Sequence, residues 1–254
     1  MQRFHSLYKT RFRLTMIAAV SLLSTSAFAQ KNVISSNQVW IQSYHEGRIS
    51  EKWNVLLDGG FRWRDGFDNK SAYIIRGAMG YSLSSKLRVS GGLAYLGVYE
   101  REKIVRHEYR PHQEILHKSA WGKVKFSNRL RIEERFFKDE VLDAATVDFN
   151  FRFRYALMVS IPVANLSTKD PTRKMLLNIG NEIFLNAGKE VTDRVFDQNR
   201  LVFSPTLQWS ENLSISLTYN SQYASTVVPD NFLQSRVYWL QIRHNLDFRD
   251  VSKK

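Results

Sequence analysis

The chain has 254 residues, with 37 Lys and Arg residues against 24 Asp and Glu residues, and therefore a formal net charge of +13. It has no cysteine, which excludes a disulfide scaffold, thiol catalysis and metal sites with cysteine ligands. The length allows one large domain or two small ones.

The N-terminus has the pattern of an export signal. Four basic residues without an acidic one precede the mostly apolar segment Leu14–Leu23, and Ala27 and Ala29 occupy the small positions of a cleavage site. This predicts a secretory signal peptide over residues 1–29 and a single mature domain over residues 30–254. The alternative, a membrane anchor, needs about 20 apolar residues. Removing the four basic residues leaves 33 basic against 24 acidic residues, a net charge of +9.

The mature chain alternates between apolar and polar residues with the period of a β-strand. The clearest segment is Val147–Ile161, where eight consecutive odd positions are apolar. About eleven segments share the pattern, in chain order 38–46, 53–63, 73–83, 87–99, 109–117, 124–136, 147–161, 175–185, 201–209, 213–223 and 238–248. The first and the fifth are the least regular. The sequence therefore predicts an all-β chain.

Alternation does not reveal which face is inside, because a soluble lipocalin-like barrel buries its apolar face and a membrane barrel exposes it to lipid. The expected strands are roughly 10 to 15 residues long, against about 5–6 in soluble sheets. Aromatic residues often bracket the apolar face, as Trp53 and Trp63 do, and such rings form the interfacial girdles of membrane barrels. We therefore expect an antiparallel transmembrane β-barrel of roughly 10–12 strands.

The connections also favour a membrane barrel, because short periplasmic turns are expected to alternate with longer extracellular loops. The short turns expected are Glu46–Lys52, Ser84–Lys86, Ser119–Gly122 and Ser210–Asn212. The longer loops expected are Asp65–Ser71, Glu100–Glu108, Lys138–Thr146, Gly188–Gln198 and Ala224–Asn231. The Pro162–Arg173 connection breaks this alternation.

The two ends of the mature chain raise a question of strand number. The last segment ends on Phe248 and resembles the terminal strand that is read during insertion of bacterial outer-membrane proteins, although six residues follow it. With both termini on the periplasmic side, the segments from Trp53 onward give ten strands, and Asn37–Glu46 is left over. Either one more strand precedes it, or it lies in the lumen. A parallel closure with an odd strand number is the rarer solution.

Several stretches resemble a bacterial outer-membrane family known as domain of unknown function family 2490. The most specific are Tyr109–Glu114 and Arg129–Phe136, and the others are Gln38–Trp40, Gly47–Trp53, Phe61–Trp63 and Phe196–Arg200. The resemblance covers essentially the whole mature chain. It implies an outer-membrane β-barrel, and it implies no catalytic residue.

If the apolar face meets lipid, the polar face fills the lumen and carries the candidate site. The ligand or lumen candidates are Arg110, His112, Glu114, Arg129, Arg131, Glu133, Arg135, Arg152, Arg154, Glu182 and Arg243. Opposite charges on neighbouring strands attract, and guanidinium groups bind carboxylates through two hydrogen bonds. One interpretation is an ion-paired plug that keeps a narrow barrel rigid. The other is an anion-preferring channel or a pocket for an acidic solute, because Arg exceeds Asp and Glu along the wall.

Enzymatic chemistry has little support in the sequence. A lipid-modifying hydrolase would need a serine, a base and an orienting group, and no G-x-S-x-G or distinctive His–Ser spacing is present. His107, His112 and His117 are five residues apart, so they alternate faces of a strand and cannot form one metal cluster. We expect no cofactor, no metal and no catalytic residue.

The expected setting is the outer membrane of a Gram-negative bacterium. The expected protein is porin-like and monomeric, in contact with outer-membrane lipids and lipopolysaccharide, and inserted by the barrel-assembly machinery. The sequence has no compact stripe of Lys and Arg for nucleic acid. A lipid-modifying hydrolase and a soluble periplasmic ligand-binding barrel remain as alternatives.

Overall fold

The computed structural model describes residues 31–140, 148–188, 195–226 and 228–249. The chain divides into two compact units, residues 1–32 and 33–254, and the barrel belongs to the second. The expected signal peptide lies outside the described residues, so it stays a prediction. None of the described residues forms a helix long and apolar enough to cross a membrane.

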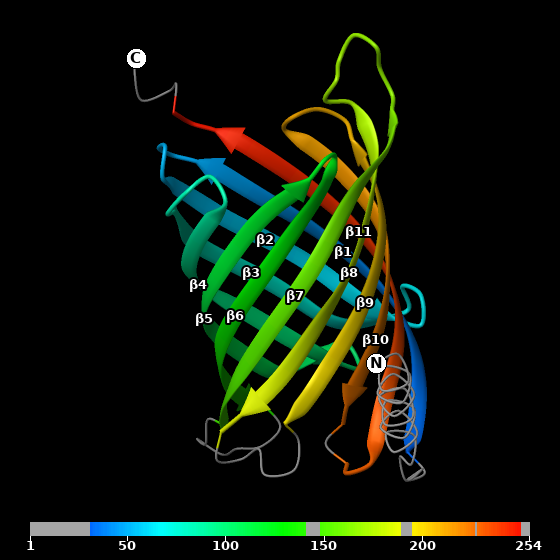
Figure 1. Ribbon diagram of the computed structural model, residues 1–254. Helices are drawn as coiled ribbons and strands as arrows, with labels where there is room; N and C mark the ends of the chain where they lie inside the picture. Colours follow the sequence, from blue (N-terminus) through cyan, green and yellow to red (C-terminus); the bar gives the residue numbers. More distant parts are fainter. Residues whose placement is uncertain (1–30, 141–147, 189–194, 227, 250–254) are drawn as a thin grey trace, which may run out of the picture. The chain divides into compact units, whose positions relative to one another are not determined.

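Eleven strands form one closed barrel (Figure 1), which confirms the predicted fold class. Each strand pairs with the next in the chain, antiparallel, from β1 through to β11. The strands are β1 Asn32–Arg48, β2 Trp53–Arg64, β3 Asn69–Ser82, β4 Leu87–Glu100, β5 Lys103–Trp121, β6 Val124–Asp139, β7 Asp148–Asn165, β8 Lys174–Ala187, β9 Phe196–Gln208, β10 Leu213–Ser225 and β11 Asn231–Asp247.

The barrel closes through a parallel pair, β1 and β11, because eleven strands in an alternating meander leave the first and last pointing the same way (Figure 1). Gln38 Nε2 donates to Ser235 Oγ at 3.1 Å, and the backbone N–H of Phe248 donates to the Arg48 carbonyl at 2.9 Å. Residue numbers thus rise together along both strands. The expectation that Asn37–Glu46 lies in the lumen or belongs to a twelve-strand barrel is wrong, since this segment is part of β1 in the wall. The third alternative, a parallel closure with an odd strand number, is confirmed.

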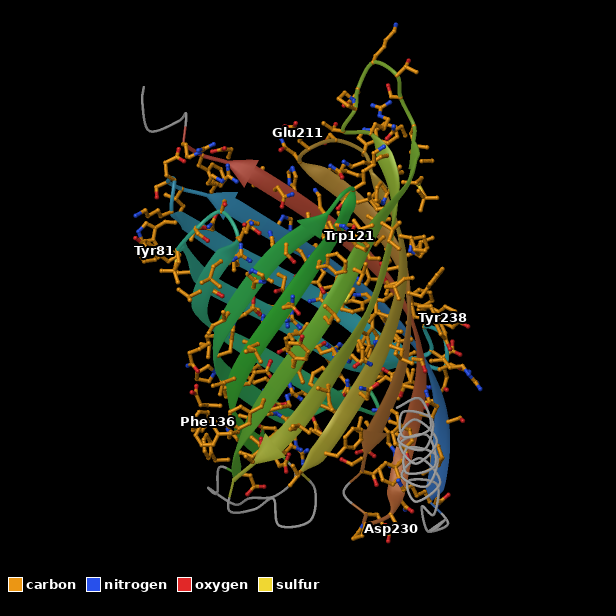
Figure 2. All side chains as sticks on the ribbon, in the orientation of Figure 1. Tyr81, Trp121, Phe136, Glu211, Asp230 and Tyr238 are labelled. Carbon is orange, nitrogen blue, oxygen red and sulfur yellow. The ribbon has the colours of Figure 1, made fainter. Side chains whose placement is uncertain are left out.

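The apolar face of the strands points outward and the polar face points inward. Phe153, Leu201 and Leu217 are exposed, while Glu133 is 2 % exposed and Arg154 is 7 % exposed. This reverses the burial of a soluble barrel. Figure 2 shows Tyr238 on the outside of the wall. The alternation of side chains along each strand fixes this arrangement, because successive residues must point to opposite faces.

Outward-facing aromatic residues gather near both ends of the strands. At one end the rings of Trp53 and Tyr81 are 4.9 Å apart. Near the other end Tyr95 contacts Tyr109 at 5.1 Å, and further ring pairs lie on β6, β7, β10 and β11. Aromatic rings at both rims of the outer face agree with the aromatic residues that flank the apolar face of the strands in the sequence.

Three turns at one end of the barrel repeat the same local structure. Each has an apolar residue, a serine, two polar residues and a second apolar residue, in the stretches 49–53, 83–87 and 209–213. The Ser50 hydroxyl accepts from the backbone N–H of Lys52 and Trp53, and Ser84 and Ser210 do the same in their turns. A serine hydroxyl that binds the backbone two and three residues on stabilises such turns.

The two ends of the barrel differ less in loop length than the sequence indicates. The connection expected over Glu100–Glu108 is a turn of only Arg101 and Glu102 with positive φ of 49° and 65°. The residues that follow this turn, from Lys103 onward, belong to β5, which is a long strand of 19 residues. The Pro162–Arg173 connection is confirmed as an exception, since Leu166–Arg173 joins β7 to β8. Thr172 donates to Asp170 in this loop and thereby lowers the pKa of the Asp170 carboxyl.

Candidate functional site

Every candidate residue named from the sequence points into the lumen. Seven of them are buried, namely Arg110, His112, Glu114, Glu133, Arg152, Arg154 and Glu182. Arg129, Arg131 and Arg135 are half-buried, and Arg243 is exposed, but all four line the central cavity. Ten of these eleven residues lie on four consecutive strands, β5 to β8, so the strand order brings them together.

Two carboxylates at the centre of this group each hold several arginines. Glu133 accepts from Arg152 and from Arg154, with N–O distances of 2.5 Å to each. Glu182 accepts from Arg154 at 2.6 Å and from Arg129 at 2.5 Å. Because Arg154 bridges both carboxylates, the network joins β6, β7 and β8 through side chains as well as through the backbone.

Two further carboxylates extend the network across β5. Glu114 accepts from Arg131 at 2.5 Å, and Arg129 lies 3.6 Å from the same oxygen. Glu108, which the sequence analysis does not single out, is 2 % exposed and binds Arg110 and Arg135 at 2.5 Å each. The inward position of Glu108, two residues before Arg110 on the same face, is the signal that could have found it. We refer to this charged inner face of β5 to β8 as the ionic wall.

Two buried aromatic residues inside the lumen were also missed by sequence reasoning. Phe184 is 1 % exposed, and the guanidinium carbons of Arg154 and Arg200 lie 4.5 and 4.6 Å from its ring centre. Trp40 on β1 is 2 % exposed, and Arg62 stacks 4.0 Å from its ring centre. Cation–π contacts of this kind gain strength where water is excluded. On both strands the even-numbered residues point inward and are mostly polar. A large apolar residue at an even position is the signal in the sequence for such a ring.

The opposite part of the inner face, on β9, β10 and β11, is polar without being densely charged. Ser204 and Thr218 share a hydrogen bond of 2.6 Å, and Thr206 and Ser216 share one of 2.8 Å. Gln241 Nε2 donates to Thr218 at 2.8 Å. We call this inner face of β9 to β11 the hydroxyl wall.

The histidines do not converge on one site, although the rings of His45 on β1 and His244 on β11 lie 6.2 Å apart. His112 lies inside, where its Nδ1 has no hydrogen-bond partner among the described residues. His107 lies on the other face and contacts Tyr95 at 2.5 Å and Glu140 at 3.2 Å. Over the part of the chain that the structure describes, no group of three or more His, Cys, Asp or Glu side chains could hold a metal ion.

The ionic wall and the hydroxyl wall, together with the inner faces of β1 to β4, enclose a cavity of about 700 Å³. Its lining runs from Glu46 and Lys118, near the serine-turn end, to Gln198 and Ser225, near the opposite end. The lining side chains, with Glu108 and Glu133 bound behind them, comprise eleven arginines and one lysine against seven carboxylates. Twelve positive groups and seven negative groups leave an excess of five positive charges around this space. The arrangement can hold or pass small anions.

Comparison with known proteins identifies relatives without a described activity. The sequence model of a family described as "Protein of unknown function (DUF2490)" matches residues 37–232. An uncharacterised protein of Methylorubrum extorquens is 28% identical over 149 residues, which cover 58% of this chain and 62% of the relative. The alignment thus spans less than two thirds of that relative's length. No solved structure matches the chain.

Proposed function

Since the chain belongs to the DUF2490 family, whose function is unknown, we propose from its lumen that it is a non-enzymatic outer-membrane barrel with a narrow pathway that prefers small anions. The excess of arginine over carboxylate around the central cavity carries this proposal. Charged side chains that line a pore select ions of the opposite sign. The outward apolar face and its two aromatic rims support a membrane location.

The size of the lumen limits what could pass. Eleven strands enclose a narrower space than the 16–18 strands of the water-filled porins. The ionic wall also fills part of this space, since side chains such as Arg154 are held across the lumen face by two carboxylates. Small anions fit this pathway, and large solutes do not. We propose a monomer that contacts lipid and lipopolysaccharide and is inserted by the barrel-assembly machinery.

A lipid-modifying hydrolase is the enzymatic alternative, and the contacts favour it less. Among the described residues, no serine hydroxyl is hydrogen-bonded to a histidine, a pairing that serine catalysis uses. The buried carboxylates of the ionic wall bind arginines and not a base. Unchanged membrane lipids after overexpression, measured by mass spectrometry, are the expected result, and a new lyso-lipid would overturn the non-enzymatic proposal.

Planar-bilayer recording of the chain 30–254 tests the pathway. We expect a small conductance whose reversal potential in a KCl gradient has the sign of anion preference. Arg243→Glu should shift this potential toward cation preference, because Arg243 lines the cavity and is bound to an amide, Gln241, and to no carboxylate among the described residues. Arg236→Glu is the matched control, since Arg236 is an exposed residue on the outer face of β11. A folded barrel without conductance would leave only a structural role.

A further inference from the structure

One arginine of the described lumen lining, Arg62, has neither an ion pair nor a hydrogen bond. Every other arginine of the cavity lining forms an ion pair or hydrogen bond, but Arg62 forms neither with any described residue. Its Nε is fully buried without a partner. A buried polar group without a partner loses its hydration and gains nothing in return. The guanidinium of Arg62 therefore retains its capacity to bind an anion that enters the lumen.

The surroundings of Arg62 are positively charged. The charged side chains that act on it most strongly are Arg200, Arg110 and Arg76. Arg76 is paired with Asp58, and Arg110 shares Glu108 with Arg135. Arg200 lies 3.7 Å from Glu182, but Glu182 also binds Arg154 and Arg129. Positive charge thus remains in excess around Arg62 and Arg200.

The indole of Trp40 holds these two arginines at a fixed place. Its Nε1 donates to Gln38 at 2.9 Å, and its ring packs edge-on against Trp239 at 5.2 Å. The guanidinium carbons of Arg62 and Arg200 lie 4.0 and 5.4 Å from the Trp40 ring centre. Gln222 accepts from Arg200 Nε at 3.0 Å and so orients its other nitrogens. Two guanidinium groups that are held in place by one indole need little reorganisation to bind a ligand.

We infer that Arg62 and Arg200, held by Trp40 and Gln222, form a binding site for a small oxyanion of the phosphate type. This deepens the proposed function and rests on it only for the route by which the anion enters. Guanidinium groups bind oxyanions through paired N–H···O bonds. A phosphate carries up to two negative charges on four tetrahedrally arranged oxygens, against one charge on the two oxygens of a carboxylate, and can therefore bind two guanidinium groups more strongly. Both arginines line the central cavity, so a small ion in the lumen can reach them.

Isothermal titration of the detergent-purified chain 30–254 with sodium phosphate tests the site, with chloride added to hold the ionic strength constant. We expect saturable binding of phosphate, at least tenfold tighter than that of acetate. Arg62→Gln should weaken phosphate binding at least tenfold. Arg62→Lys should retain part of the binding, since it keeps the charge and loses the planar fork. Arg236→Gln removes one positive charge from the outer face and should leave binding unchanged.

Folding of each variant is checked by the heat-dependent shift of the barrel in gel electrophoresis, and Arg62→Lys carries the test if Arg62→Gln does not fold. Equal affinities for phosphate and acetate, or a folded Arg62 variant that binds as the wild type does, would overturn the site. Conductance is recorded on the same preparation. Phosphate binding without conductance refutes the pathway and supports the site. Anion-selective conductance without phosphate binding refutes the site and supports the pathway.

Discussion

The ionic wall on β5 to β8 and the hydroxyl wall on β9 to β11 satisfy their inward-facing polar groups in different ways. Both present polar side chains to the lumen, whereas most apolar side chains of the same strands point outward. On the ionic wall each carboxylate serves two or more arginines, as Glu133 does with Arg152 and Arg154. On the hydroxyl wall short uncharged side chains form small hydrogen-bonded groups, such as Ser204, Thr218 and Gln241. We therefore expect the ionic wall to lose stability cooperatively when one carboxylate is removed, and the hydroxyl wall to lose only the contacts of the residue that is changed.

Removal of one central carboxylate should therefore have the largest effect. Glu133→Gln leaves Arg152 and Arg154 beside an amide that cannot neutralise them, and Arg131 lies 3.7 Å from the same carboxylate. Breaking a buried ion pair from one side costs about 3–5 kcal/mol. We expect a loss of that size in the free energy of unfolding, measured by urea titration of the barrel in detergent. Glu134→Gln, the same change on the next, outward residue, is the control.

A cost for Glu133→Gln no larger than for Glu134→Gln would mean that the arginines find water or other partners in the lumen. The ionic wall would then be a set of separable contacts, like the hydroxyl wall, and the contrast between the two would disappear.

The packing of β3 against β4 offers an intermediate effect. A Cβ at Gly92 would meet the Gly77 carbonyl oxygen at 2.2 Å, whereas at Gly91 its nearest neighbour would be the His112 carbonyl at 3.9 Å. Gly92→Ala should destabilise the barrel by about 1–3 kcal/mol, the usual cost of forcing extra volume into a packed site. Gly91→Ala is the matched control and should fold as the wild type does. The measurement is the same urea titration. Equal stabilities of the two variants would show that the backbone of β3 and β4 can move apart at little cost in free energy.

A change on the hydroxyl wall should cost less. Thr218→Val removes a hydroxyl that binds Ser204 at 2.6 Å and Gln241 at 2.8 Å. Gln241 lines the cavity, so water can replace the hydroxyl group that Gln241 loses as a partner. The loss should be about 1 kcal/mol, the net value of an ordinary hydrogen bond. Thr218→Ser retains the hydroxyl and should keep most of the stability that Thr218→Val loses. A loss as large as that of Glu133→Gln would mean that the hydroxyl wall is also cooperative.

The sequence predicts the faces of the strands because side chains alternate strictly along β-structure. The inward position of Arg154 and the outward position of Phe153 follow from that rule alone. The pairing of Arg154 with Glu182 does not, since it depends on the register between β7 and β8 and on two long, flexible side chains. For the same reason Glu108 was overlooked as the partner of Arg110 and Arg135.

The closure of the barrel illustrates a second limit. Bacterial barrels usually have an even strand number, and that expectation assigned Asn37–Glu46 to the lumen or to a twelve-strand barrel. The hydrogen bond between Gln38 and Ser235 shows a contact almost 200 residues apart in the chain. Local periodicity identifies a strand, but it carries no information on which distant strand becomes its neighbour. The buried Trp40 of the proposed anion site lies on this same strand, which explains why it was missed.

The smallest effect is expected outside the lumen, at an ion pair as short as those of the ionic wall. Glu51 Oε1 lies 2.5 Å from Arg249 Nη1, the same distance that separates Glu133 from Arg152, but its side chain is 84% exposed against 3% for Glu133. Water and salt screen an exposed pair, and ordering two long side chains offsets most of the remaining attraction. Glu51→Gln should therefore leave the urea midpoint unchanged at low and at high salt. A marked loss at low salt would show that distance, and not burial, determines what an ion pair contributes to this barrel.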